Sequence, residues 1–146
     1  MRRILLISLL LTISIQLSAQ KNSRMIVTTD IGGADPDDIQ SLIHLFVELD
    51  QVDLEGIISQ HAWVPYGHGA DSVISRIIDG YEEVLPNLRA HSKGFPSAQY
   101  LRSIVKIGQP EAAMAGVGEG KDTEGSNWII SVVDKDDKRP VWISAW

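Results

Sequence analysis

The residues best suited to do chemistry in this sequence form an acidic segment over residues 28–38 (TTDIGGADPDD). Four of its side chains are carboxylates that fall within a stretch of nine residues: Asp30, Asp35, Asp37 and Asp38. Carboxylates this close repel one another unless a positive charge compensates them, and oxygen ligands suit Ca²⁺ or Mg²⁺. The two glycines of the segment allow the backbone to turn tightly around an ion. The segment is therefore a candidate site for a hard cation.

The same residues also have simpler explanations. Asp37 and Asp38 can stabilise a helix N-terminus without any ligand, and Asp35-Pro36 can be an ordinary turn. The spacing does not fit an EF-hand loop, because no Glu stands at position 12 counted from Asp30. The glycines form neither G-x-G-x-x-G nor a P-loop with its Lys. A nucleotide-phosphate site is thus disfavoured, while a metal site and a helix-capping role both remain open.

The elements around the acidic segment predict where it lies. Residues 24–29 (RMIVTT) are typical of a β-strand, and from Asp37 the apolar residues recur at helical spacing through Leu49. Residues 53–59 (DLEGIIS) predict a second strand, which gives a βαβ unit with parallel strands. Ligands of open α/β sheets bind at the carboxyl ends of the strands, and the acidic segment follows one such end.

The rest of the chain continues the same alternation. We expect helices over residues 70–81, 97–107 and 126–134, strands over 88–90 and 141–146, and a loop over 109–125. This order predicts an α/β fold with an open, mostly parallel, Rossmann-like sheet flanked by helices. Because nothing follows the last strand, we expect residues 20–146 to be the N-terminal part of a longer domain, truncated here.

The N-terminus and the composition restrict the functional class. Residues 1–19 combine a basic start, a short apolar run and small residues, which is typical of a cleaved signal peptide rather than a membrane anchor. The protein is then secreted or periplasmic, and loss of Arg2 and Arg3 takes the net charge of −6 to −8. That charge argues against nucleic acid as a partner. The chain has no Cys, which excludes disulfides and thiolate metal sites.

The run IVTTDIGGADPDDIQSLIHLF resembles the opening motif of the nucleoside hydrolase superfamily: an Asp-rich strand end, a Gly and an Asp-Asp pair that begins a helix. The resemblance is closer to a divergent branch of secreted, nucleoside hydrolase-like proteins described as cellulose-binding or of unknown function. Four further segments resemble that branch: DLEGIIS, YEEVLPNLRAHSKGFPSAQYLRSIVKIG, EGSNWII and RPVWISAW. The resemblance covers essentially all of the chain after the predicted signal peptide.

The resemblance implies roles for individual residues. It makes Asp30 a Ca²⁺ ligand and the general base that acts on a calcium-bound water. It makes Asp37 the residue that contacts the sugar hydroxyls and Asp38 a second Ca²⁺ ligand. It also implies a main-chain carbonyl ligand near Trp146. The implied activity is hydrolysis of N- or O-glycosidic bonds.

The sequence also departs from the family pattern. Thr28 stands where simple nucleoside hydrolases have another Asp, and three extra residues separate Asp30 from the Asp-Asp pair. Whether Asp35 compensates is open. The family's remaining metal ligand and its leaving-group acid come from the second half of the domain. We therefore expect this polypeptide alone to bind metal weakly and to have little or no turnover.

Three functional hypotheses follow. The first is an exported, calcium-dependent hydrolase whose substrate is a small sugar or a nucleoside. The second is a non-catalytic carbohydrate-binding protein of the same fold, with a polysaccharide such as cellulose as its partner. The third is a structural fragment with an acidic turn. The aromatic and His residues of the loop His61–His68 could stack on a sugar, although a packed surface loop is the commoner arrangement. Trp128, Trp142 and Trp146 are expected to pack in the core or sheet rather than to form a sugar platform, and the oligomeric state is not predicted.

Overall fold

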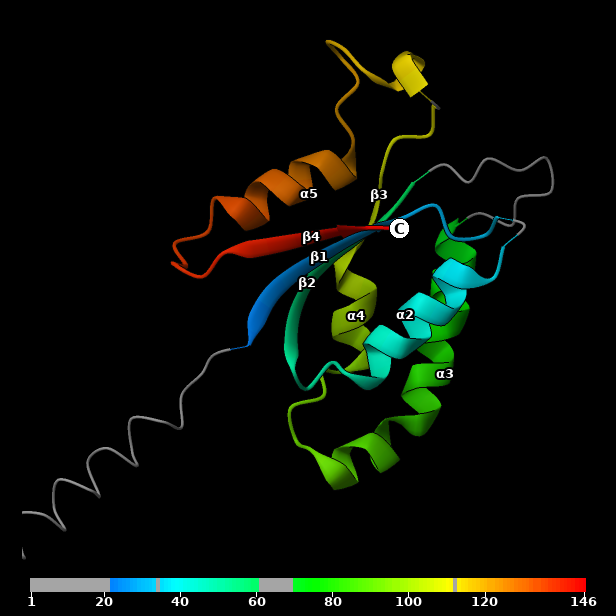
Figure 1. The fold of residues 1–146 in the computed structure, drawn as a ribbon, viewed down its shortest axis with the longest axis vertical. Helices are drawn as coiled ribbons and strands as arrows, with labels where there is room; N and C mark the ends of the chain where they lie inside the picture. Colours follow the sequence, from blue (N-terminus) through cyan, green and yellow to red (C-terminus); the bar gives the residue numbers. More distant parts are fainter. Residues whose placement is uncertain (1–21, 34, 61–69, 112) are drawn as a thin grey trace, which may run out of the picture.

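The structure, a computed structural model, describes residues 22–33, 35–60, 70–111 and 113–146 (Figure 1). The predicted signal peptide and the loop His61–His68 lie outside these residues. The elements are, in chain order, β1 (Ser23–Thr29), α2 (Asp37–Val47), β2 (Val52–Ser59), α3 (Ala70–His91), α4 (Ala98–Ile104), β3 (Val105–Ile107), the 3₁₀ helix η1 (Ala113–Gly116), α5 (Glu124–Val133) and β4 (Val141–Ala145). No helix among the described residues is long and apolar enough to cross a bilayer.

The strands form one sheet in the order β3-β2-β1-β4, and every pairing in it is parallel. Helices α2, α3 and α4 cover one face of this sheet, and α5 covers the other (Figure 1). The predicted α/β fold with a parallel sheet and flanking helices is therefore confirmed. The topology brings the carboxyl ends of β1, β2 and β4 to one edge, which is the edge where the acidic segment begins.

The larger core lies between the sheet and the layer of α2, α3 and α4. Apolar side chains of alternate strand residues, such as Val27 and Ile57, meet Leu42 and Phe46 of α2 and Ile74 of α3 there. The smaller core lies under α5, where Ile26 and Ile58 contact Val132. Alternation of Ile26 and Val27 between the two cores is the period-2 pattern of a strand buried on both faces.

Two sequence-based expectations about elements are wrong. Residues 88–90 are not a strand but the last turn of α3, which runs on because Ile74, Ile78, Tyr81 and Leu85 form one buried stripe at helical spacing. The helix expected over residues 97–107 is split. Helix α4 ends at Ile104, and Val105–Ile107 pair with residues 57–59 of β2 to form the edge strand β3.

Helix α5 also begins earlier than expected. Its N-cap is Thr123, whose hydroxyl accepts a hydrogen bond from the Ser126 backbone N–H at 3.0 Å, while the Ser126 hydroxyl accepts one from the Thr123 N–H at 2.9 Å. Ser126 is thus the third residue of a capping box and not the cap itself. The loop expected over residues 109–125 contains the short helix η1.

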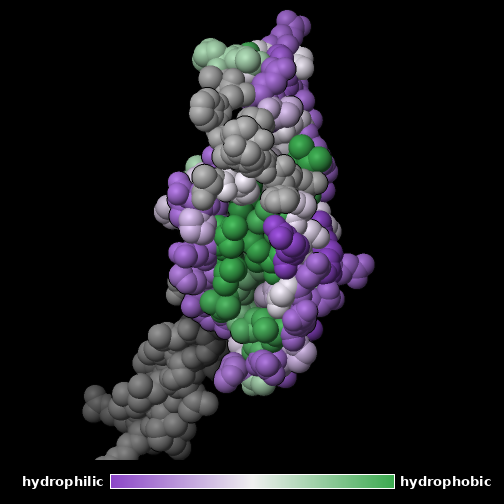
Figure 2. Space-filling model, turned by 90° about the vertical axis from the view of Figure 1, so that its right-hand side faces the viewer, coloured by the Kyte–Doolittle hydropathy of each residue, from purple (hydrophilic) through white to green (hydrophobic). Residues whose placement is uncertain are grey.

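The outer surface of α2 and α3 carries an apolar groove of about 630 Å³. Figure 2 views this side of the molecule and shows a hydrophobic stripe flanked by polar side chains. The stripe includes Ile43, Val47 and Val84, each of which remains nearly half exposed. Part of the apolar surface of both helices is therefore left uncovered by the other described residues.

Candidate functional site

The site predicted from the sequence lies where β1 and its neighbours end. The Trp146 backbone N–H donates to the Thr28 carbonyl at 3.0 Å, and the Gln60 N–H donates to the Thr29 carbonyl at 2.8 Å. These bonds align the residues that follow β4 and β2 with the end of β1. Asp30 is the first residue after that end, so it lies beside the polypeptide segments that leave all three strands.

Asp38 is held in place by the strand that precedes it. Its side chain is only 8% exposed, and its Oδ2 accepts a hydrogen bond of 2.5 Å from the Thr29 hydroxyl. The same hydroxyl oxygen accepts the Ile31 N–H at 3.1 Å, which leaves its hydrogen for Asp38. Thr29 therefore fixes both the start of the acidic loop and the carboxylate at the beginning of α2.

The structure brings Asp30 and Asp38 together. Partial burial of its carboxyl raises the pKa of Asp30, and the negative charge of Asp38 and a side-chain hydrogen bond with it raise this pKa further. Asp37 adds a smaller repulsion. In the part of the chain that the structure describes, no Lys, Arg or His forms an ion pair with Asp30, Asp37 or Asp38. Among the described residues, the cluster thus has negative charge without a local counter-charge.

The two remaining acidic residues of the segment are exposed, as Asp30 is. Asp37 is exposed, and its Oδ1 accepts the Asp38 backbone N–H at 3.0 Å, a contact that helps to start α2. Asp35 is exposed in the loop before the helix. Thr28 occupies the position at which simple nucleoside hydrolases have another Asp. It is a buried residue of β1. Only Asp30 and Asp38 converge among the four carboxylates.

A divalent cation fits this donor chemistry in part. Two carboxylates with mutual repulsion are the oxygen ligands that Ca²⁺ uses, but Ca²⁺ takes six to eight oxygens. Among the described residues no group of three or more His, Asp or Glu side chains is arranged to hold an ion. Backbone carbonyls, water or further side chains would have to supply the remaining oxygens.

The sequence analysis missed Thr29 and a second charged cluster at the opposite edge of the sheet. Arg24 of β1 is 1% exposed, and its guanidinium contacts Glu55 of β2 at 2.5 and 3.2 Å. Lys135 also contacts Glu55, at 2.5 Å. Burial alone would raise the pKa of Glu55, but the hydrogen bonds from Arg24 and Lys135 outweigh it and lower this pKa. The available signal was the charged residues within two strands, Arg24 in β1 and Asp53 and Glu55 in β2.

The three tryptophans that the structure describes differ in environment. Trp128 packs against both cores and donates its indole N–H to the Glu55 carbonyl at 2.7 Å. Trp146 packs at the margin of the larger core. Trp142 of β4 is 63% exposed, so the expectation that it is a packed residue is wrong within the described part of the chain. The reason is that β4 is the edge strand of the described sheet.

An all-parallel sheet with helices on both faces and carboxylates beyond its first strand defines the class of this protein as an α/β domain. Residues 24–146 match the family described as "Cellulose-binding Sde182, nucleoside hydrolase-like domain". The chain belongs to this family.

One solved structure supports the same assignment. It is a nucleoside hydrolase-related hypothetical protein from Saccharophagus degradans that is associated with carbohydrate metabolism, 46% identical to this chain with a TM-score of 0.76. The match covers 84% of this chain and 30% of that one, so the chain spans less than a third of this relative. No curated protein sequence matches the chain at a significant level.

Proposed function

We propose that the strand-end carboxylates belong to the active site of an exported hydrolase that cleaves N- or O-glycosidic bonds. The observation that carries the proposal is the convergence of Asp30 and Asp38 at the carboxyl edge of the sheet without a compensating cation in the described residues. The family's nucleoside hydrolase-like description agrees with this class of reaction. The substrate is a small sugar or a nucleoside.

Each carboxylate has its own role in this proposal. Asp30 is the general base that accepts a proton from the attacking water. Asp38, fixed by Thr29, holds Ca²⁺ together with Asp30. When bound, Ca²⁺ supplies positive charge that offsets the carboxylates and makes a nearby water more acidic. Asp37 is exposed at the start of α2 and binds sugar hydroxyls.

Calcium titration by calorimetry tests the metal site. A longer protein that contains this chain and the rest of the domain should bind Ca²⁺, and Asp38→Asn in it should abolish the heat of binding. Asp136→Asn is the matched control, because it removes one exposed carboxylate near the opposite edge of the sheet and should leave binding unchanged. No calcium binding, or binding that Asp38→Asn does not alter, would rule out the proposed metal site.

A carbohydrate-binding role without turnover is the second candidate. It is supported by the words "cellulose-binding" in the family description and by the carbohydrate association of the Saccharophagus degradans relative. Sugar binding that persists in a chelator, with no hydrolysis of inosine or of aryl glycosides by a protein that contains this chain, would favour it. Export itself is tested by mass spectrometry of the mature protein, which should begin at Gln20.

A further inference from the structure

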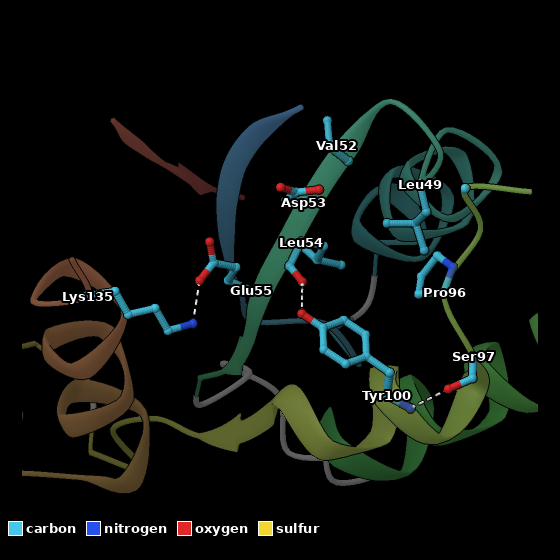
Figure 3. A pocket seen from close by; sticks show the side chains of 10 residues that line it. Leu49, Val52, Asp53, Leu54, Glu55, Pro96, Ser97, Tyr100 and Lys135 are labelled. Carbon is cyan, nitrogen blue, oxygen red and sulfur yellow. Dashed lines mark hydrogen bonds and ion pairs between the residues drawn. The ribbon is translucent and has the colours of Figure 1, made fainter. Parts of the chain in front are cut away.

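A pocket of about 450 Å³ lies at the opposite edge of the sheet from Asp30. Its size falls within the range of small-molecule sites, about 300–1,000 Å³. Figure 3 shows its walls: the first half of β2, the loop and first turn that lead into α4, and a lysine that follows α5. The residues that matter for recognition are Val52, Asp53, Glu55, Ser97, Tyr100 and Lys135.

The pocket is separate from the strand-end carboxylates. Ser23 pairs with Val52 and Thr29 pairs with Ser59, so residues 52–55 lie at the amino end of β2, while Asp30 follows the carboxyl end of β1. A ligand here would not contact Asp30 or Asp38. Any binding in this pocket is therefore independent of a metal at the other edge.

Tyr100 presents a fixed aromatic face to the pocket. Its hydroxyl donates to the Leu54 carbonyl at 2.9 Å, and its backbone N–H donates to Ser97 Oγ at 3.1 Å (Figure 3). Burial and the charges of Glu55 and Asp53 raise the pKa of Tyr100, so the hydroxyl stays protonated. The residue is nevertheless 41% exposed. A rigid, amphipathic ring of this kind binds a flat apolar surface at low cost in conformational entropy.

The charged groups of the pocket are already paired. Asp53 contacts Arg139 at 2.5 Å, and Glu55 contacts both Arg24 and Lys135 at 2.5 Å. A metal ion would have to displace these cations, and a phosphate would meet two carboxylates. The local balance of charge therefore favours a neutral ligand.

Hydrogen-bonding capacity remains beside these ion pairs. Lys135 is half exposed and has three N–H donors, of which one contacts Glu55. Ser97 Oγ accepts the Tyr100 N–H, which leaves its hydroxyl hydrogen to donate. Asp53 uses Oδ2 for Arg139, and Oδ1 can accept. Donors and acceptors thus surround an aromatic face.

We propose that this pocket binds a neutral hexose ring of an oligosaccharide, with the C–H face of the sugar stacked on Tyr100 and its hydroxyls bonded to Asp53, Ser97 and Lys135. The site goes beyond the proposed hydrolase, and only the choice of a sugar as ligand rests on the carbohydrate association proposed above. It would hold a chain of sugar residues at a distance from the strand-end carboxylates.

The test is an NMR titration of the full ¹⁵N-labelled chain with cellotetraose in the presence of EDTA. We expect amide shifts to change for residues 52–55 and 94–101. Tyr100→Ala should weaken binding by about tenfold or more, whereas Tyr100→Phe keeps the ring and should stay within about threefold of the unaltered protein. Trp142→Ala is the control, because it removes an exposed aromatic ring that lies on β4 and does not line the pocket.

Three results would overturn the proposal. They are the absence of any shift with cellotetraose, shifts confined to residues outside the pocket, and loss of binding in Trp142→Ala but not in Tyr100→Ala. If Tyr100→Ala does not fold, the shift map of the unaltered protein and the Tyr100→Phe affinity still decide the matter. EDTA separates this test from the calcium titration, so either site can fail while the other stands.

Discussion

The buried pair of Arg24 and Glu55 makes a quantitative prediction about stability. Glu55→Gln keeps the shape of the side chain but leaves the Arg24 guanidinium, 1% exposed, without its carboxylate. Loss of one partner of a buried pair costs about 3–5 kcal/mol of the free energy of unfolding. We expect the lower end of that range, because the Val132 carbonyl at 2.6 Å and the Arg139 carbonyl at 3.4 Å still accept from Arg24.

The control is a carboxylate that also pairs with an arginine but on the surface. Glu82 contacts Arg102 at 2.7 Å with its own side chain 57% exposed, so Glu82→Gln should cost about 1 kcal/mol or less. Denaturant titration of the full chain measures both variants, and a loss of 3 kcal/mol corresponds to a fall in Tm of roughly 10 °C. Equal losses in the two variants would refute the argument from burial.

The pH dependence of stability gives a second readout for the same pair. The hydrogen bonds of the pair lower the pKa of Glu55 below the ordinary value of 4.5. At pH values between the lowered pKa and 4.5, the folded state therefore holds fewer protons than the unfolded state. The stabilisation is therefore present above pH 4.5 and is lost as the pH falls through the lowered pKa. Glu55→Gln should show a flatter loss of stability in acid than the unaltered protein.

Three further predictions concern the site and its scaffold. Gly125→Ala should destabilise the docking of α5 by about 1–3 kcal/mol in denaturant titration, because a Cβ there would lie 2.6 Å from the Ile58 side chain and 3.0 Å from a backbone carbonyl of the next strand. Thr29→Val should weaken calcium binding measured by calorimetry, whereas Thr29→Ser, which keeps the hydroxyl that fixes Asp38, should not. Calcium affinity should fall as the pH is lowered through the raised pKa of Asp30, since the proton competes with the ion, and a pH-independent affinity would exclude Asp30 as a ligand.

The sequence was sufficient to predict the central βαβ unit. The apolar period changes from two to 3.6 and back between residues 24 and 59, and the parallel pairing of β1 with β2 agrees with this pattern. The same pattern placed all four carboxylates of the segment beyond β1, and the family resemblance implied that Asp30 and Asp38 form the pair.

Other features of the fold and of the site depend on tertiary contacts, which the local sequence does not predict. Residues 88–90 have the composition of a short strand, but helix α3 continues through them because its buried stripe reaches Leu85. Residues 105–107 continue a helical pattern, yet they pair with β2. The role of Thr29 is also non-local, since its hydroxyl contacts a side chain nine residues away.

The irregular register of β2 sets Glu55 apart from the regular pairing with β1. Met25 pairs with Leu54 and Ile26 pairs with Gly56, which makes Glu55 the extra residue of a bulge. At this edge Glu55 and Asp53 have arginine or lysine partners, so a neutral ligand is favoured. At the other edge no cation among the described residues pairs with Asp30 or Asp38, and burial together with the charge of Asp38 raises the pKa of Asp30. A cation should therefore bind at the edge with Asp30, and a neutral sugar at the edge with Glu55. Binding of the cation at the Glu55 edge and of the sugar at the Asp30 edge would contradict the electrostatic argument.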